Sequence, residues 1–374
     1  MAVTAEAMQT ISRLTPLADV LAMIDTEVKS ITQRTIDVSA AMGRALASDA
    51  MAPARPASSL ALQDGWALNA DETLGASGYT PVQLMRTPAR IEAGHTLPAG
   101  TDSVAPLDAV KITSDHAEAL AAISPGDGVL AAGGDNDSAI PLRRAGERLR
   151  ATDLAAFAAT GLVRVTVREP RVRVLPLRGS GIISAAARLL TADIERRGGA
   201  ARLDESGRGL DVAMAAESSD MLLAIGGTGS GRNDNSVQVL AREGRLAVHG
   251  LALTPGETAA LGFVGPRPVL LVPGRLDATL SVWLVLGRRL LDRLSAARSS
   301  DGDSAAILSL ARKVTSTVGL AEVVPVRRIG GQAEPLASKY LPLSSLARSD
   351  GWILVPADSE GFSGGSAVQV RPWP

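Results

Sequence analysis

The chain has 374 residues, with 38 Lys and Arg against 39 Asp and Glu, and it contains no cysteine. The near-zero net charge argues against a dedicated binder of nucleic acid or membrane surfaces, because such proteins carry a basic excess. The absence of cysteine excludes disulfides, thiolate zinc sites and thiol nucleophiles. Histidine occurs only three times, so a multi-histidine metal site is not expected.

The hydrophobic fraction of 46% suffices for packed cores, and the length suggests two or three domains. No apolar run approaches the ~18 residues that a membrane span needs. Residues 1–13 lack the basic start and apolar run of a signal peptide. We therefore expect a soluble, cytoplasmic protein that binds neither membranes nor nucleic acid.

The first part of the chain combines helical and β-like patterns. Apolar residues repeat at helical spacing over residues 17–28, and a second short helix is expected over residues 37–47. Residues 62–140 contain short strand-like pieces among Gly, Pro and Asp turns, which predicts a small β-rich module. Helical spacing returns at residues 152–160.

From residue 170 the pattern changes to an alternation of strands and helices. The expected strands surround Val172 and Val174 and cover residues 220–225 and 269–272, and the expected helices cover 184–197, 234–242 and 277–294. Apolar strands that alternate with helices predict a parallel sheet covered on both faces. A Ser-, Asp- and Gly-rich linker at residues 295–305 precedes a small β-domain.

The sharpest local feature is a run of glycines that follows the apolar strand 220–225. This Gly-rich loop consists of Gly226, Gly227, Thr228, Gly229, Ser230 and Gly231. A turn between a strand and a helix presents backbone N–H groups and a helix N-terminus, which suits a phosphate or an oxyanion. The spacing matches neither a Walker loop nor a Rossmann loop. It therefore leaves both a phosphate site and a purely structural turn open.

Four charged residues stand out near this loop or in similar turns. Asp220 and Asp234 flank the loop and could hold a Mg²⁺ ion that bridges phosphates, or serve as a strand-end carboxylate and a helix N-cap. Asp64 is either a site carboxylate or part of an Asp-Gly turn. Arg275 follows an apolar strand, where open α/β sheets bind ligands, although a surface arginine is the alternative.

Several segments, taken in order, match a known pattern over nearly the whole chain. They are Gly-Arg-Ala-Leu-Ala at 43–47, Gln-Asp-Gly-Trp-Ala at 63–67, residues 91–104, residues 220–234, Thr-Pro-Gly-Glu at 254–257, Val-Pro-Gly-Arg at 272–275 and residues 343–351. Together they resemble the molybdopterin molybdenumtransferase family, the molybdenum insertases that include the C-terminal part of gephyrin.

The resemblance implies a multidomain protein of α/β and β modules. The expected parts are a discontinuous elongated helical domain (1–53 and 136–168), an inserted β-rich module (54–135), a three-layer α/β domain like those that bind molybdopterin (169–300) and a C-terminal domain like a β-barrel (301–374). It also implies a homodimer, with the active site between the α/β domain of one subunit and the inserted module of the other.

The reaction that the resemblance implies is the hydrolysis of adenylated molybdopterin with a divalent metal such as Mg²⁺, with insertion of molybdate and release of AMP. The residues that match the family's site fall into two groups. The implied catalytic residues are Asp64, Asp220 and Asp234, of which Asp220 and Asp234 would also bind the metal. The implied binding residues are those of the Gly-rich loop together with Pro255, Gly256, Pro273, Gly274 and Arg275.

Several family residues are replaced in this chain. The family's acidic Thr-Gly-Asp-Glu loop aligns with Gly179, Ser180, Gly181 and Ile182, which carry no carboxylates. The lysines of Lys-Pro-Gly-Lys are Thr254 and Glu257, and Arg275 and Leu276 replace an Asn and a Pro. The sequence therefore leaves three interpretations: an active enzyme, a non-catalytic paralogue that binds molybdopterin or the finished cofactor, or a scaffold that binds another nucleotide.

Overall fold

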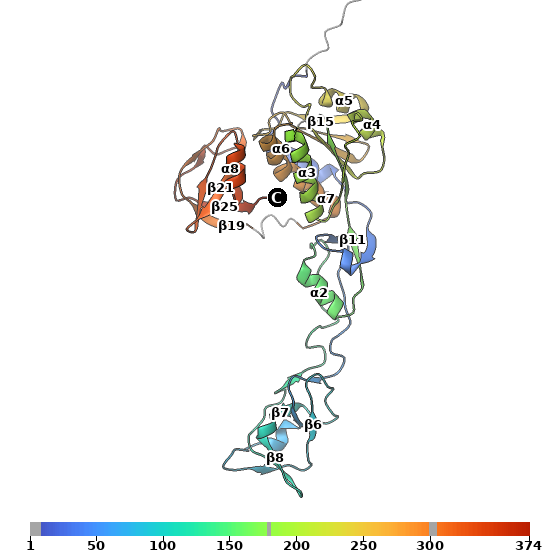
Figure 1. Cartoon of the computed structure of the whole chain (residues 1–374), viewed down its shortest axis with the longest axis vertical. Coiled ribbons are helices and arrows are strands. Elements are labelled where there is room, and N and C mark those ends of the chain that lie inside the picture. The colour runs from blue at the N-terminus through green and yellow to red at the C-terminus, as the bar shows by residue number, and fades with distance from the viewer. Residues whose placement is uncertain (1–8, 178–180, 299–304) are drawn as a thin grey trace, which may run out of the picture. The chain divides into compact units, whose positions relative to one another are not determined.

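The computed structural model describes residues 9–177, 181–298 and 305–374 of the chain (Figure 1). The chain forms two structural units. Unit 1 contains Met1–Ser48, Ala145–Arg150 and Arg164–Pro374, and unit 2 contains Asp49–Arg144 and Ala151–Val163. These units are coarser than the four expected domains, whose limits stay predictions. No helix in the described residues combines the length and apolar character that a membrane crossing requires.

A six-stranded sheet forms the centre of the α/β domain in unit 1. Its order is β13 (Ala200–Leu203), β12 (Arg171–Pro176), β14 (Met221–Ile225), β18 (Arg267–Val272), β17 (Ala260–Val264) and β15 (Arg245–His249). The first four strands are parallel, as the sequence predicts. β17 is antiparallel to both neighbours, because only a short turn joins it to β18 and a parallel crossover needs a dozen or more residues.

Helices cover both faces of this sheet and divide its core in two. The helices are α1 (Leu17–Glu27), α3 (Gly181–Arg196), α4 (Leu210–Ala215), α5 (Ser236–Glu243), α6 (Leu276–Val282) and α7 (Arg288–Ser295), with a π-helical turn at Trp283–Gly287. In β14, Met221, Leu223 and Ile225 pack with α1, α3, α6 and α7. Leu222 and Ala224 pack on the other face with α4 and α5. The expected three-layer arrangement is confirmed.

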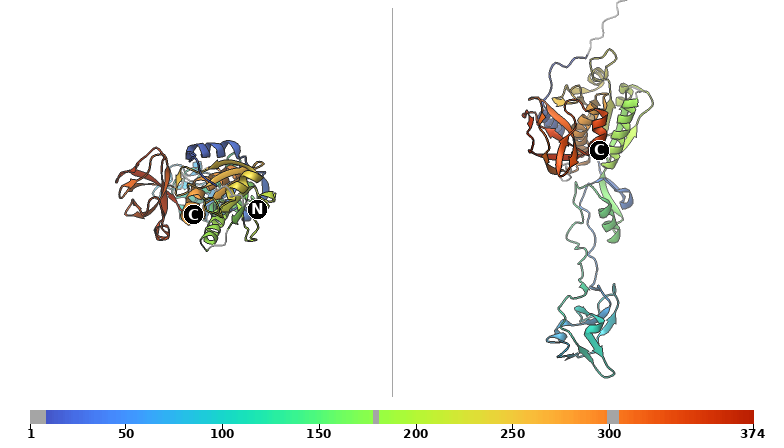
Figure 2. Two further views of the ribbon diagram at one scale, coloured as in Figure 1. Left: turned by 90° about the horizontal axis from the view of Figure 1, so that it is seen from above. Right: turned by 60° about the vertical axis from the view of Figure 1, so that its left-hand side comes forward.

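The C-terminal domain is a closed barrel. Its strands pair in the cyclic order β21 (Ala321–Ile329), β22 (Gln332–Pro335), β19 (Ala306–Leu310), β25 (Ala367–Pro372) and β23 (Gly351–Val355), and β23 pairs again with β21. β16 (Leu253–Thr254) joins the outside of β21, β20 (Val314–Thr315) pairs with β24 (Gly361–Phe362), and α8 (Leu343–Arg348) precedes β23. The barrel lies beside α6 (Figure 1), and Leu341 donates its backbone N–H to Asp277 at 3.3 Å. Figure 2 shows the same barrel from two further directions.

The expected helix at residues 37–47 is wrong. β1 (Arg34–Asp37) leads into a 3₁₀ turn at Val38–Ala40, and β2 (Ala45–Leu46) follows. Both strands pair antiparallel with β11 (Arg164–Arg168), more than a hundred residues away in sequence. These long-range hydrogen bonds override the local helical spacing.

Unit 2 is rich in short strands, as the sequence predicts. They are β3 (Leu60–Ala61), β4 (Gly65–Leu68), β5 (Val82–Gln83), β6 (Ala89–Ile91), β7 (Ser103–Ala105), β8 (Val110–Ile112), β9 (Ala117–Ala119) and β10 (Val129–Leu130). The unit also contains the helix α2 (Ala151–Ala159) and 3₁₀ turns at Ala70–Thr73 and Leu107–Ala109.

Candidate functional site

Two loops meet at the carboxyl ends of the neighbouring parallel strands β14 and β18. The register pairs Ile225 with Val272, so the Gly-rich loop and residues 273–275 leave the sheet side by side. The N–H of Gly226 donates to the carbonyl of Val272 at 2.8 Å. A Cβ atom on Gly274 would lie 3.6 Å from the Cα atom of Gly226. The two backbones are therefore neighbours at the edge where open α/β sheets bind ligands.

The Gly-rich loop has a backbone conformation that requires glycine at its start. Gly226 and Gly227 have φ angles of +101° and +72°. Ser236, the first residue of α5, donates its hydroxyl to the carbonyl of Gly227 at 2.6 Å. Asp234 accepts the N–H of Gly231 at 3.3 Å through Oδ2, so this carboxylate stabilises the loop itself. The helix N-cap position is occupied by Asn235, not by Asp234.

The loop at residues 254–257 also reaches this edge. The hydroxyls of Thr228 and Thr258 lie 2.9 Å apart and connect it to the Gly-rich loop. Thr254, Pro255 and Gly256 are buried. Gly256 has a φ of +141°, and its N–H donates to Oε2 of Glu257 at 3.0 Å. The structure thus brings the Gly-rich loop, Pro255 and Gly256 together with the loop of Arg275.

Arg275 is held at the start of α6 by a carboxylate and an aromatic ring. Its Nε and Nη2 atoms donate to Oδ1 and Oδ2 of Asp277 at 3.1 and 2.6 Å. The guanidinium lies 5.2 Å from the centre of the Tyr340 ring. The hydrogen bonds that Arg275 donates to the Asp277 carboxylate raise the pKa of Arg275, and the charge of Glu257 raises it further. The side chain remains 60% exposed, so one side of this cation faces solvent.

A cavity of about 250 Å³ adjoins this arginine between the α/β domain and the barrel. Its walls are Ile182, Gly274, Arg275, Leu276, Asp277, Tyr340, Leu341 and Leu343. Asp277 and Tyr340 were not expected as site residues. The spacing of Arg275 and Asp277 across a helix start is a local signal for their pairing, whereas Tyr340 is brought in by the barrel and carries no local signal.

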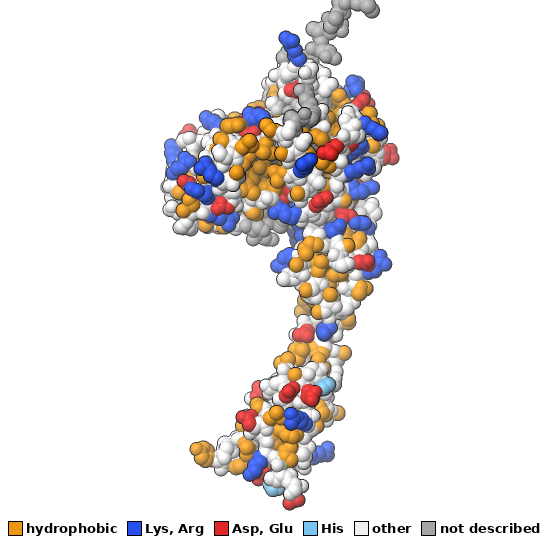
Figure 3. Space-filling view, in the orientation of Figure 1, with side chains coloured by type: hydrophobic (Ala, Val, Ile, Leu, Met, Phe, Trp, Pro, Cys, Tyr) orange, Lys and Arg blue, Asp and Glu red, His pale blue; other side chains and the backbone are white. Residues whose placement is uncertain are grey.

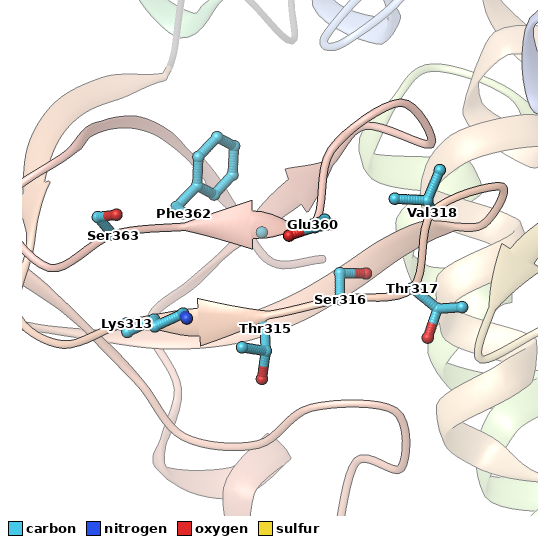
Figure 4. A pocket seen from close by; sticks show the side chains of 9 residues that line it. Lys313, Thr315, Ser316, Thr317, Val318, Glu360, Phe362 and Ser363 are labelled. Carbon is cyan, nitrogen blue, oxygen red and sulfur yellow. The ribbon is translucent and has the colours of Figure 1, made fainter.

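Two further cavities lie outside the cavity beside Arg275. One of about 320 Å³ lies on the other side of the Gly-rich loop, against α4 and α5, where Asn233, Asn235 and Arg242 line it with Gly227. Another of about 450 Å³ lies in the C-terminal domain around β20 and β24, where Figure 4 shows Lys313, Glu360 and neighbouring hydroxyl side chains. The latter shares no lining residue with the loops at the carboxyl edge.

Asp220 lies at the opposite end of β14 from the Gly-rich loop. Its carboxylate accepts the backbone N–H of Arg171 at 2.8 Å and pairs with the guanidinium at 3.1 and 2.9 Å. Five strand residues separate Asp220 from Gly226, which corresponds to about 20 Å at a strand's rise per residue. The structure does not bring Asp220 and Asp234 together, so the expectation of one cation held by both carboxylates is not supported.

Asp64 belongs to unit 2. It lies in the turn between β3 and β4, where it is exposed, and its Oδ1 accepts the N–H of Ala93 at 2.9 Å. A Cβ on Gly65 would lie 2.1 Å from the carbonyl oxygen of Ala105, so glycine is required after it. The Asp-Gly turn is therefore present, and a catalytic role of Asp64 stays a prediction. Gly179 and Ser180 lie outside the described residues.

Charge around the site is mixed. Glu257 and Asp277 accompany Arg275, and the surface in Figure 3 intersperses basic and acidic side chains over the α/β domain. No group of three His, Asp or Glu side chains in the described part of the chain could hold a metal ion.

Comparison with known proteins gives consistent matches along the chain. Residues 5–161 match the model of the MoeA N-terminal region (domain I and II), and residues 307–373 match that of the MoeA C-terminal region (domain IV). A molybdopterin biosynthesis protein of Methanocaldococcus jannaschii is 24% identical over 90% of this chain and 91% of its own length. Molybdopterin molybdenumtransferase 2 of Mycobacterium tuberculosis is 25% identical over 64% of this chain and 70% of its own length.

Solved structures share the fold. The crystal structure of the molybdopterin biosynthesis MoeA protein from Pyrococcus horikoshii OT3 superposes with a TM-score of 0.78 at 21% identity, covering 96% of this chain and all of that chain. A second structure of the P. horikoshii protein gives a TM-score of 0.77 at 24% identity and covers 97% of this chain and all of its own. The chain therefore belongs to the MoeA family of molybdopterin molybdenumtransferases, a family of molybdenum cofactor biosynthesis.

Proposed function

We propose that this protein inserts molybdate into adenylated molybdopterin and releases AMP, using the loops at the carboxyl edge of its sheet. The observation that carries the proposal is the convergence of the Gly-rich loop, residues 254–257 and Arg275 at this edge. Family membership supports the same substrate class. The proposal includes a homodimer, in which Asp64 would approach the loops of another subunit.

The loops supply two kinds of anion contact. The Gly-rich loop offers backbone N–H groups beside the first turn of α5, where the helix dipole favours negative charge. Arg275 offers a guanidinium that binds phosphate or molybdate oxygens in two-point geometry. The cavity beside Arg275 and Tyr340 has apolar walls at Ile182 and Leu343, which suits a flat ring next to an anionic group.

The described residues do not fit a metal ion held by the protein alone. Asp234 contacts the N–H of Gly231, and Asp220 lies at the far end of β14. Asp220 and Asp234 therefore do not form a shared Mg²⁺ site in the described residues. In the proposed reaction Arg275 and the loop N–H groups bind and orient the anionic groups. The same donors stabilise the negative charge that develops during cleavage.

The test is AMP release from adenylated molybdopterin by purified protein, with molybdate and Mg²⁺ present, measured by chromatography. We expect AMP to appear in a molybdate-dependent manner and in proportion to the protein. Tight binding of adenylated molybdopterin without AMP release would instead identify a non-catalytic binder, consistent with Thr254 and Glu257 in place of lysines. Binding of an unrelated nucleotide, with no affinity for molybdopterin, would contradict both functions.

A further inference from the structure

Gln9, near the beginning of the chain, contacts the Gly-rich loop. Its Nε2 atom donates to the carbonyl of Gly227 at 2.8 Å and to that of Gly229 at 2.6 Å. Both partners are acceptors, so the amide orientation is determined: the NH₂ group must face the loop. The side chain is 7% exposed, and its Oε1 atom is buried without a hydrogen-bond partner among the described residues.

The two bound carbonyls determine where the loop's N–H groups point. In a trans peptide the C=O of one residue and the N–H of the next point in opposite directions. With the carbonyls of Gly227 and Gly229 turned toward Gln9, the N–H groups of Thr228 and Ser230 are turned away from it. Neither N–H has a hydrogen-bond partner within the described residues. Thr228 is only 2% exposed, and a buried donor without a partner is rare unless a ligand or water supplies one.

The segment that carries Gln9 also holds the neighbouring loop. The N–H of Thr15 donates to the carbonyl of Gly250 at 2.9 Å, and the N–H of Ala252 donates to the carbonyl of Thr15 at 2.8 Å. Ile11 packs against Gly250, where a Cβ atom would lie 2.5 Å from its methyl group. Residues 9–15 therefore join the Gly-rich loop to the chain that leads into residues 254–257.

We propose that Gln9 is a positioning residue of the anion site: it holds two carbonyls so that the N–H groups of Thr228 and Ser230 face a bound oxyanion. The ligand class is a phosphate or molybdate group, which rests on the proposed function. Gln9 acts through the backbone and does not itself touch the reacting atoms. Gln9 lies more than two hundred residues from the loop in sequence, and the tertiary fold brings the two together.

The first experiment measures AMP affinity by calorimetry in the full chain. Gln9→Leu removes both donors, and we expect AMP to bind about 5- to 150-fold more weakly, because each of the two hydrogen bonds contributes about 0.5–1.5 kcal/mol. Thr10→Val, at the exposed neighbouring position, is the matched control and leaves the affinity unchanged. Equal affinities of the wild type and Gln9→Leu would overturn the proposal.

A second variant, Gln9→Glu, makes AMP affinity depend on pH, which a loss of packing would not do. In Gln9→Glu the ionised carboxylate faces two carbonyl oxygens, whereas the protonated acid has one O–H to donate. We expect its AMP affinity, relative to Gln9→Leu at the same pH, to rise as pH falls from 8 to 5. The comparison with Gln9→Leu removes the titration of AMP itself. A pH-independent ratio of the two affinities would contradict the role of Gln9 as a donor.

Hydrogen exchange tests the same contact without a ligand. The N–H groups of Ser236 and Gly231 are bonded within the loop, that of Ser236 to the carbonyl of Gly227. We expect both to exchange at least about fivefold faster in Gln9→Leu than in the wild type or Thr10→Val. Unchanged exchange would overturn the positioning role. Failure of the wild type to bind AMP, with faster exchange in Gln9→Leu, would reject the proposed function and leave the loop contact supported.

Discussion

Arg275 is the residue on which the charge of the carboxyl edge depends. The sequence resemblance places Arg275 at the position of a family asparagine and the nearby Glu257 at that of a family lysine. Asp277 offsets part of its charge through two hydrogen bonds. The exposed side of the guanidinium still offers donors to an oxyanion, so a single arginine can replace part of what the missing lysines would supply.

We predict that Arg275→Ala weakens AMP and molybdate binding by about 10- to 150-fold, since a charge-assisted contact contributes about 1.5–3 kcal/mol. Calorimetric titration of both ligands measures the change. Arg245→Ala is a closely matched control, because Arg245 pairs with Glu27 and stacks 4.6 Å from the ring of Phe263. It lies at the other end of the sheet and leaves both affinities intact. Equal losses in the two variants would show that Arg275 acts only through stability.

At the scale of elements, a buried carboxylate ties α3 to the helices after β18. Asp193 of α3 is 2% exposed and accepts the indole N–H of Trp283 at 2.7 Å and the Nε–H of Arg288 at 3.0 Å. Arg288 is equally buried. Although burial alone would raise the pKa of Asp193, the arginine and indole donors hold it below its ordinary value. This cluster keeps α3, the π-helical turn and α7 in one arrangement beneath the site.

Asp193→Asn is predicted to lower the free energy of unfolding of the whole chain by about 3 kcal/mol, because it removes the charged carboxylate that pairs with the buried guanidinium of Arg288. Urea titration followed by circular dichroism measures it. The control is Asp37→Asn, whose carboxylate is 74% exposed and lies 3.8 Å from Arg164. We expect that control to cost well under 1 kcal/mol. Similar midpoints for the two variants would refute the structural role of Asp193.

For the whole molecule, ion pairs determine how stability responds to acid. Asp204 accepts hydrogen bonds from Ser206 and is paired with Arg173, and these contacts lower its pKa to about 2. Arg289 similarly lowers the pKa of Asp25. A carboxylate whose pKa is lower in the folded state binds protons more readily when unfolded. Its stabilisation is therefore complete above the unfolded pKa near 4 and is lost as pH falls toward 2.

The pH dependence yields a prediction for Asp204. Asp204→Asn should be less stable than the wild type by about 2 kcal/mol at pH 7, and the difference should shrink between pH 4 and pH 2. Urea unfolding at a series of pH values measures it. A stability gap that stays constant down to pH 2 would mean that the carboxylate charge is not its source.

Local patterns in the sequence alone determine several elements of this protein and its family. The apolar run of β14 predicts a strand buried on both faces, and the helical spacing of residues 17–28 predicts α1, because burial and period are local properties. The order of the motifs predicts the family and the carboxyl-edge loops, since each motif meets a backbone requirement at its own position, such as the positive φ angles of Gly226 and Gly227.

Only the tertiary structure decided the rest. Asp220 and Asp234 flank the loop in sequence, yet an extended strand carries Asp220 to the opposite edge, into an ion pair with Arg171. Tyr340 meets Arg275 because the barrel lies beside α6, and Gln9 meets Gly227 because residues 9–15 cross the loops. Contacts between distant segments depend on how the faces of helices and sheets pack and how strands pair. The spacing of residues within one segment predicts neither.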